Sequence, residues 1–182
     1  MAELSLVHLV RQANGVQAFA QFMAAYRQQP PGCPHELVLL TKGFQGSFPR
    51  AYWAHLEGLP KLPRLLHLGD EGFDLGPYHH AAVELRSELL CFVNSFSQPL
   101  QAGWLAHLRQ ALVPGVGAVG CSGTFESVVR SVEDLQQRTH PVRSPLRKLW
   151  LGLNLQWARR DFEGFPNPHL RTNAFLASRE VL

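Results

Sequence analysis

Short patterns of glycine and histidine are the first residues in this sequence that could carry chemistry. Gly115–Gly120 matches G-x-G-x-x-G, which binds dinucleotide phosphates when the loop follows a strand and opens a helix. Here the glycines follow Pro114 and lie within a strand-like segment, so we do not expect a dinucleotide site. His79 and His80 are adjacent, and neighbours on a helix point about 100° apart. We therefore expect one of them to pack, one to face solvent, and neither to bind metal.

Nucleophile and thiol motifs give no stronger signal. The sequence has neither G-x-S-x-G nor G-x-x-x-x-G-K-[ST]. Cys91 and Cys121 lie in apolar segments, where a thiol usually fills the core. With Cys33 they make three cysteines and no C-x-x-C pair, so neither a disulfide framework nor a cysteine zinc site is expected. This pattern favours a reducing compartment.

Composition limits the class of protein. The 182 residues are 46% hydrophobic and 17% charged, which indicates a globular chain, and we assign one domain to 1–182. The net charge of +3 permits an anionic ligand such as a diphosphate or a lipid headgroup, and we expect no nucleic-acid partner. Apolar runs such as Leu89–Val93 fall far short of the roughly 20 residues that span a bilayer, and no signal peptide is evident. We expect a cytoplasmic protein.

Strand-like and helix-like segments alternate along the first half of the chain. Short apolar runs of the buried-strand type are separated by segments with helical i, i+3, i+4 spacing. This order predicts an α/β fold with a mostly parallel open sheet and helices on both faces. The loops after parallel strands meet at one edge, where ligands bind in open sheets. The predicted strands are 4–10, 36–41, 65–68 and 88–93, the helices 16–28, 47–57 and 77–86, and the loops 11–14, 42–47, 69–74 and 94–99.

The second half continues with helical spacing at 104–112 and 125–135 and strand-like segments at 116–121 and 169–178. The most basic part of the chain, Arg143 to Arg160, overlaps an amphipathic segment at 144–160. We expect the apolar side of this helix to pack on the sheet, and a peripheral contact with an anionic membrane surface is the alternative. That side carries Leu146, Leu149, Trp150, Leu153 and Trp157.

Four segments in order resemble the GT-A glycosyltransferases, close to the family 2 type. Residues 74–82 and 88–97 resemble the helix and strand that lead to the metal-binding D-x-D of that family. Residues 103–120 resemble the next helix and strand, and 165–180 resemble the strand before the acceptor-side segment. The resemblance implies a Rossmann-like fold that binds a nucleotide-diphosphate sugar and transfers the sugar to an acceptor hydroxyl, as in polysaccharide biosynthesis. The acceptor would be a glycan or a lipid-linked molecule.

The same resemblance implies which residues contact the donor. Arg11 and Gln12 after the first strand and Lys42 after the second would contact the nucleotide, with Asp70 and Asp74 lining the same pocket.

At the D-x-D position the sequence has Asn94-Ser95-Phe96. An amide and a hydroxyl add no negative charge for a hard cation, so binding of Mn²⁺ or Mg²⁺ is disfavoured. Asn94 and Ser95 would then face the diphosphate, and Arg171 would help to stabilise it in a metal-independent transfer.

The catalytic base is the weakest part of the resemblance. In inverting family members a carboxylate beyond the position of Arg179–Glu180 deprotonates the acceptor, and Glu180 is the nearest carboxylate here. Two alternatives stay open: a C-terminally truncated transferase for hexosyl or deoxyhexosyl groups, or a catalytically inactive binding or scaffold module. A nucleotidyltransferase is disfavoured because it would be expected to show clustered carboxylates for Mg²⁺.

Overall fold

The computed structural model describes residues 3–139 and 144–182, and its contacts divide the chain into two compact units. The first unit is Met1–Ser122 with Arg171–Leu182, and the second is Gly123–Leu170. The structure does not test whether the two units form one functional domain over 1–182, so that assignment stays a prediction.

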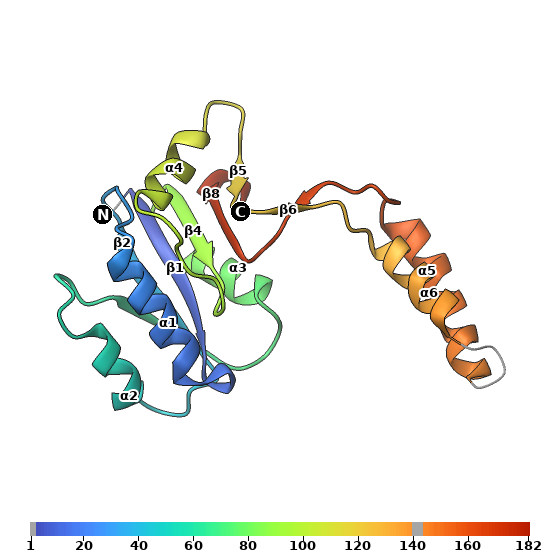
Figure 1. Cartoon of the computed structure of the whole chain (residues 1–182), viewed down its shortest axis with the longest axis horizontal. Coiled ribbons are helices and arrows are strands. Elements are labelled where there is room, and N and C mark those ends of the chain that lie inside the picture. The colour runs from blue at the N-terminus through green and yellow to red at the C-terminus, as the bar shows by residue number, and fades with distance from the viewer. Residues whose placement is uncertain (1–2, 140–143) are drawn as a thin grey trace. The chain divides into compact units, whose positions relative to one another are not determined.

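A six-stranded sheet forms the first unit, in the order β3-β2-β1-β4-β8-β5 (Figure 1). Its parallel part confirms the predicted α/β sheet and consists of β1 (Leu4–Arg11), β2 (Glu36–Lys42), β3 (Arg64–Leu68) and β4 (Leu89–Val93). Strand β8 (Ala174–Ser178) is antiparallel to both β4 and β5 (Ala118–Gly120). The single strand predicted at 169–178 is two strands in the structure, because a turn at Thr172–Asn173 separates β7 (His169–Leu170) from β8.

The core lies on both faces of this sheet, as predicted, which explains why its strands are apolar at nearly every position. One face carries Phe19, Phe22 and Met23 of α1 (Gly15–Gln28), together with Leu105 and Leu108 of α4 (Trp104–Ala111). The short helix α2 (Arg50–Trp53) and the 3-10 turn Ala54–Leu56 complete that face. The other face is covered by α3 (Leu75–Glu84).

Helix ends and the histidine pair differ from the expectations. Asn14 is the last residue of a 3-10 turn, Gln12–Asn14, and occupies the N-cap position of α1, but its side chain makes no capping hydrogen bond. The helix expected at 47–57 begins later, at Arg50, and continues from α2 into the 3-10 turn Ala54–Leu56, so its end agrees with the expectation. His79 and His80 are both exposed, because α3 buries only the side that carries Tyr78, Ala81 and Ala82.

The second unit pairs α5 (Val128–Arg138) with α6 (Pro145–Asp161) beside the two-stranded sheet of β6 (Gly123–Thr124) and β7. Helix α6 is apolar on two opposite sides. Leu151, Leu155 and Ala158 are buried on one side, and Leu155 and Ala158 pack with Val129 of α5. The other side, which the sequence predicted to pack on the sheet, is 49–81% exposed, so periodicity did not indicate which side is covered within this unit. Packing of the exposed side on the sheet stays a prediction. Arg143, where the basic stretch begins, lies outside the described residues.

Candidate functional site at the carboxyl edge of the sheet

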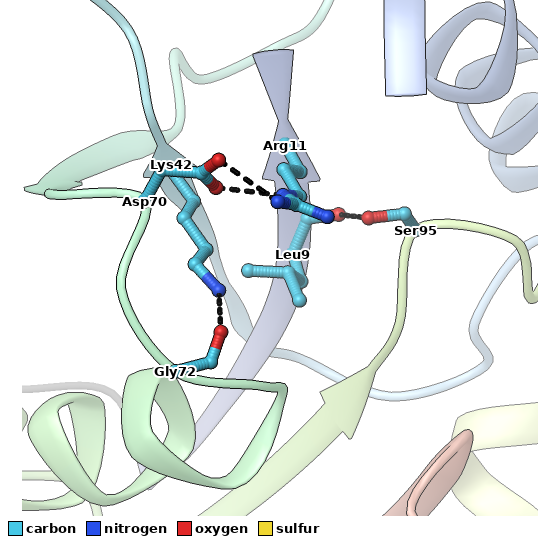
Figure 2. Close-up of polar contacts among 6 residues, drawn as sticks. All are labelled: Leu9, Arg11, Lys42, Asp70, Gly72 and Ser95. Atoms are coloured by element: carbon cyan, nitrogen blue, oxygen red, sulfur yellow. Dashed lines mark hydrogen bonds and ion pairs between the residues drawn. The ribbon is translucent and has the colours of Figure 1, made fainter. Parts of the chain in front are cut away.

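The ends of β1, β2 and β3 lie level with one another, which places their following loops together. Arg11 pairs with Lys42 in the β1–β2 register, and Lys42 pairs with Leu68 in the β2–β3 register. Asp70 follows Leu68 by two residues. Arg11 and Asp70, far apart in the sequence, therefore meet at this edge, as Figure 2 shows.

The Arg11–Asp70 contact is a bidentate ion pair. Arg11 donates from Nε to Asp70 Oδ1 at 2.6 Å and from Nη2 to Oδ2 at 2.8 Å. The hydrogen bond from Arg11, with its positive charge and that of Lys42, holds the pKa of the Asp70 carboxyl below its usual value. Both side chains are partly exposed, so this pair presents a fixed guanidinium at the surface of the edge.

Lys42 has a structural contact here. Its side chain is only 2% exposed, and Nζ donates to the carbonyl of Gly72 (Figure 2). Gly43 has φ +77°, and a Cβ there would lie 3.1 Å from the Asp70 side chain, so glycine allows the close approach of the two loops. Through their contacts with Asp70 and Gly72, Arg11 and Lys42 both hold the loop after β3. Lys42 lines neither of the two cavities described below.

Asn94 and Ser95 follow β4 and are also engaged by their own chain. The Asn94 Oδ1 accepts hydrogen bonds from the backbone N–H of Phe96 at 3.1 Å and of Ser97 at 2.9 Å. Buried Ser95 donates from Oγ to the carbonyl of Leu9 at 2.8 Å (Figure 2). The two side chains therefore shape the loop after β4 and tie it to β1.

Two cavities flank this loop. The smaller, about 140 Å³, combines four of the predicted residues, Arg11, Asp74, Asn94 and Ser95. The larger, about 540 Å³, lies on the other side of the loop, beside β8 and the start of α4. It is lined by Val93, Ser97, Gln98, Pro99, Leu100, Gln101, Trp104, Cys121, Ser122, Asn173 and Ala174.

The remaining predicted residues are divided between the two edges of the sheet. Gln12 is exposed in the turn after β1. Arg171 lies at the carboxyl edge, where its N–H donates to the Ser122 carbonyl at 3.1 Å. Glu180 does not join them, because β8 runs antiparallel: its last residue, Ser178, pairs with Leu89, the first residue of β4. Glu180 therefore lies beyond the opposite edge.

The residues that line the larger cavity were mostly missed by sequence reasoning. Trp104 was interpreted only as part of an apolar helical stripe, Cys121 as core, and Asn173 as part of a strand. In the structure Cys121 is exposed. Its position immediately after a short edge strand is the one local signal that could have indicated this.

Comparison with known proteins places the chain by its fold. No family model matches it, and no curated protein matches it in sequence. A mannosyltransferase from Pyrobaculum calidifontis, in complex with GDP-Man and Mn²⁺, aligns with a TM-score of 0.55 and 17% identity. Glucosyl-3-phosphoglycerate synthase from Mycobacterium tuberculosis, in complex with UDP, aligns with a TM-score of 0.54 and 13% identity. The chain has the GT-A fold of nucleotide-diphospho-sugar transferases.

The similarity extends over most of this GT-A chain but over less of its neighbours. The alignment covers 74% of the chain and 38% of the mannosyltransferase, and 100% of the chain and 58% of the synthase. The bifunctional glycosyltransferase WbbM aligns with a TM-score of 0.56 and 10% identity over 98% of the chain and 32% of its own. The chain thus spans less than two thirds of the length of each of these proteins.

The oxygen atoms at the D-x-D position do not suit a divalent metal ion. Asn94 Oδ1 already accepts two N–H groups, and Ser95 Oγ donates to Leu9. Asp74 is the nearby carboxylate of the smaller cavity, while Asp70 is paired with Arg11. Within residues 3–139 and 144–182, no group of three or more His, Cys, Asp or Glu side chains could hold a metal ion.

Proposed function

We propose that the carboxyl edge of this GT-A domain binds a nucleotide-diphosphate sugar, and that the protein transfers the sugar to an acceptor hydroxyl without a metal ion. The observation that carries the proposal is the grouping of Arg11, Asp74, Asn94 and Ser95 around one cavity at the edge where open α/β sheets bind ligands. The two units would work together as one transferase domain.

The proposed reaction is a displacement at the anomeric carbon of the donor sugar. The bond from this carbon to the diphosphate oxygen breaks, and a bond to the acceptor oxygen forms while the acceptor loses its proton. Negative charge develops on the leaving diphosphate, and cationic donors at the edge, Arg11 and Arg171, would stabilise it. The base is left unassigned, because Glu180 lies beyond the other edge.

Replacing Arg11 with alanine should weaken nucleotide binding by about 10- to 100-fold, because a hydrogen bond to a charged group contributes roughly 1.5–3 kcal/mol. Binding of UDP, GDP and dTDP and of their sugars is measured by calorimetry, with Mn²⁺ and with a chelator. Arg86→Ala is the matched control, since Arg86 is exposed and precedes β4 at the opposite edge. Asp70→Asn removes the carboxylate that pairs with Arg11 but leaves the Arg11 cation in place, so this variant should still bind nucleotides.

The competing function, an inactive binding or scaffold module, is favoured by the hydrogen bonds that Asn94 makes within its own loop and Ser95 makes to Leu9 of β1. Equal affinities for the Arg11→Ala and Arg86→Ala variants would contradict the proposed donor site. The scaffold alternative predicts that no nucleotide binds. Binding that requires Mn²⁺ would contradict the metal-independent transfer.

We also propose that α6 contacts an anionic membrane surface. Its exposed side carries Leu146, Leu149, Trp150, Leu153 and Trp157, opposite the side that packs with α5. Arg147, Lys148, Arg159 and Arg160 lie on the same helix, with Asp161 its one acidic residue. Indole rings with cationic side chains suit the interface of an anionic bilayer. No helix in the part of the chain that the structure describes is both long and apolar enough to traverse one.

Sedimentation with lipid vesicles tests this contact. We expect the chain to bind vesicles of phosphatidylcholine with phosphatidylserine at least about 5-fold more tightly than phosphatidylcholine alone, since each basic residue near the surface adds roughly 1 kcal/mol. Replacing Trp150 and Trp157 with serine should abolish the binding. Trp53→Ser in the first unit should not change it. Equal binding to both kinds of vesicle, or no binding, would rule out an anionic lipid surface.

A further inference from the structure

The larger cavity is formed entirely within the first unit, from segments that are distant in the sequence. Val93 ends β4, and residues 97–101 follow in the next loop. Trp104 begins α4, while Cys121–Ser122 and Asn173–Ala174 flank the β5–β8 pair. Its volume of about 540 Å³ lies in the range of pockets that hold small molecules.

The lining of this cavity carries no charge among the described residues. Its polar side chains are amides and hydroxyls, and the remainder are apolar or the indole of Trp104. The smaller cavity, in contrast, contains Arg11 and Asp74. A charged group placed against this lining would lose part of its hydration and gain no counter-charge from the lining side chains. A neutral ring with hydroxyl groups and an apolar face suits amides beside an aromatic side chain.

Hydrogen bonds within the chain orient one of these amides. Asn173 Oδ1 accepts from Ser122 Oγ at 3.1 Å and from the N–H of Ala174 at 3.0 Å. With its oxygen engaged, Asn173 has its Nδ2 hydrogens as donors for a ligand. The backbone carbonyl of Asn173 accepts from Asn94 N–H at 2.8 Å, which joins this wall to the loop of the proposed donor site.

Trp104 adds an aromatic surface and a donor that its own chain does not use. Its ring lines the cavity and packs beside the core. The Nε1 atom is buried and has no hydrogen-bond partner among the described residues.

We propose that this cavity binds the uncharged pyranose ring of a sugar, and that it discriminates against phosphorylated or carboxylated sugars. Its assignment to the transfer reaction rests on the proposed function. There the ring belongs either to a neutral acceptor glycan or to the sugar of the donor. In the first case the acceptor is a neutral hydroxyl compound and not a sugar phosphate, and in the second case the transferred sugar is uncharged.

Alkylation of Cys121 reports occupancy of the cavity directly, because this exposed thiol belongs to the lining. The residue is exposed, but neighbouring atoms partly desolvate its thiol and raise the pKa of that thiol. The reaction with iodoacetamide is therefore run at mildly alkaline pH and followed by peptide mass spectrometry. Cys33, outside the lining, is the internal control in the same sample. The probes are methyl glycosides of neutral hexoses and deoxyhexoses, the corresponding sugar phosphates, and nucleotides with and without their sugars.

We expect neutral glycosides to slow alkylation of Cys121 at least 5-fold, with Cys33 unchanged and sugar phosphates without effect. Protection by glycoside alone identifies an acceptor ring. Protection by a nucleotide sugar but not by its nucleotide identifies the donor ring. Protection by sugar phosphates as strong as by glycosides, or no protection by any sugar, would overturn the inference.

Variants at exposed Gln98 sharpen the test without disturbing the core. Gln98→Ala should reduce protection by glycosides, and Gln98→Lys should allow sugar phosphates to protect. Gln110→Ala, an exposed glutamine of α4 outside the lining, is the control.

Nucleotide binding, measured separately by calorimetry, distinguishes the two proposals. If nucleotides bind and neither glycosides nor nucleotide sugars protect, this inference fails and the donor site stands. If glycosides protect and nucleotides do not bind, the proposed function fails and the sugar-binding cavity stands.

Discussion

Replacing Phe92 with alanine is expected to lower the free energy of unfolding of the first unit by about 3–5 kcal/mol, the typical cost of removing a buried phenyl ring. Phe92 lies on β4 and is fully buried. Its ring centroid is 4.6 Å from that of Tyr78 on α3 and 5.1 Å from that of Phe175 on β8. The substitution therefore removes the contact that joins α3 and β8 to the centre of the sheet.

The effect of Phe92→Ala is large relative to the total stability of a domain, which is about 5–15 kcal/mol. It also bears on function, because Asp74 immediately precedes α3 and Asn94 follows Phe92 by two residues. Loosening of this packing should therefore weaken nucleotide binding as well.

Urea unfolding checks this prediction when it is followed by the fluorescence of Trp53 and Trp104. Replacing Trp150 and Trp157 with phenylalanine in all variants removes the signal of the second unit. Phe96→Ala is the matched control, because Phe96 is 72% exposed and should contribute less than about 0.5 kcal/mol. A loss below about 1 kcal/mol for Phe92→Ala would contradict the central packing role of this ring.

Acidification should destabilise the first unit through His8, by about 2 kcal/mol between pH 6.5 and pH 5. His8 is fully buried on β1, its ring stacks on Phe22 with centroids 3.6 Å apart, and neither ring nitrogen has a hydrogen-bond partner among the described residues. Burial lowers its pKa to about 3.

The direction of this pH effect follows from proton binding. Between about pH 3 and the unfolded value of about 6.5, the unfolded chain binds a proton at His8 that the folded chain does not bind. The free energy of unfolding therefore falls as the pH falls through this interval, by about 1.4 kcal/mol per pH unit. Above pH 6.5 both states are neutral at His8, and it contributes no pH dependence.

Replacing His8 with leucine should remove this part of the acid sensitivity. The comparison is the difference in unfolding free energy between about pH 7.5 and pH 5, measured for the wild type and the variant, so that other titrating groups cancel. His79→Gln, which removes an exposed imidazole, should retain the wild-type dependence. An unchanged pH dependence in His8→Leu would mean that the imidazole is protonated with little penalty in the folded protein.

The fold and part of the carboxyl edge could be predicted from the sequence. Strand β1 is buried at nearly every position because helices cover both faces of the sheet, and its mostly apolar sequence indicates that burial. Right-handed crossovers then bring the loops after β1 and β4 to one edge, which is why Arg11 and Asn94 line the same cavity. These results depend on the order of the elements and not on the details of packing.

Local patterns could not determine which groups the side chains contact. Lys42 looked available for a nucleotide, but its burial and its bond to Gly72 follow from the path of the loop after β3. Glu180 lies at the opposite edge because β8 is antiparallel to β4. A short apolar segment has the same hydrophobic pattern whether its strand is parallel or antiparallel, so the sequence did not indicate this direction. The sides of α6 were ambiguous for a similar reason, since periodicity marks apolar residues but not which of two apolar faces will be covered.

The sequence by itself determined the α/β class and the carboxyl edge, because these depend on residue order and periodicity, whereas the nucleotide-sugar hypothesis came from the resemblance of four segments to the GT-A glycosyltransferases. Only the tertiary structure decided that Arg11 pairs with Asp70, that Ser95 is bonded to Leu9, and that a cavity lined by uncharged side chains lies at the carboxyl edge. The partners in these two contacts are separated by 59 and 86 residues. Hydrogen bonds and ion pairs require approach within about 3 Å, so only the folded chain selects the partners.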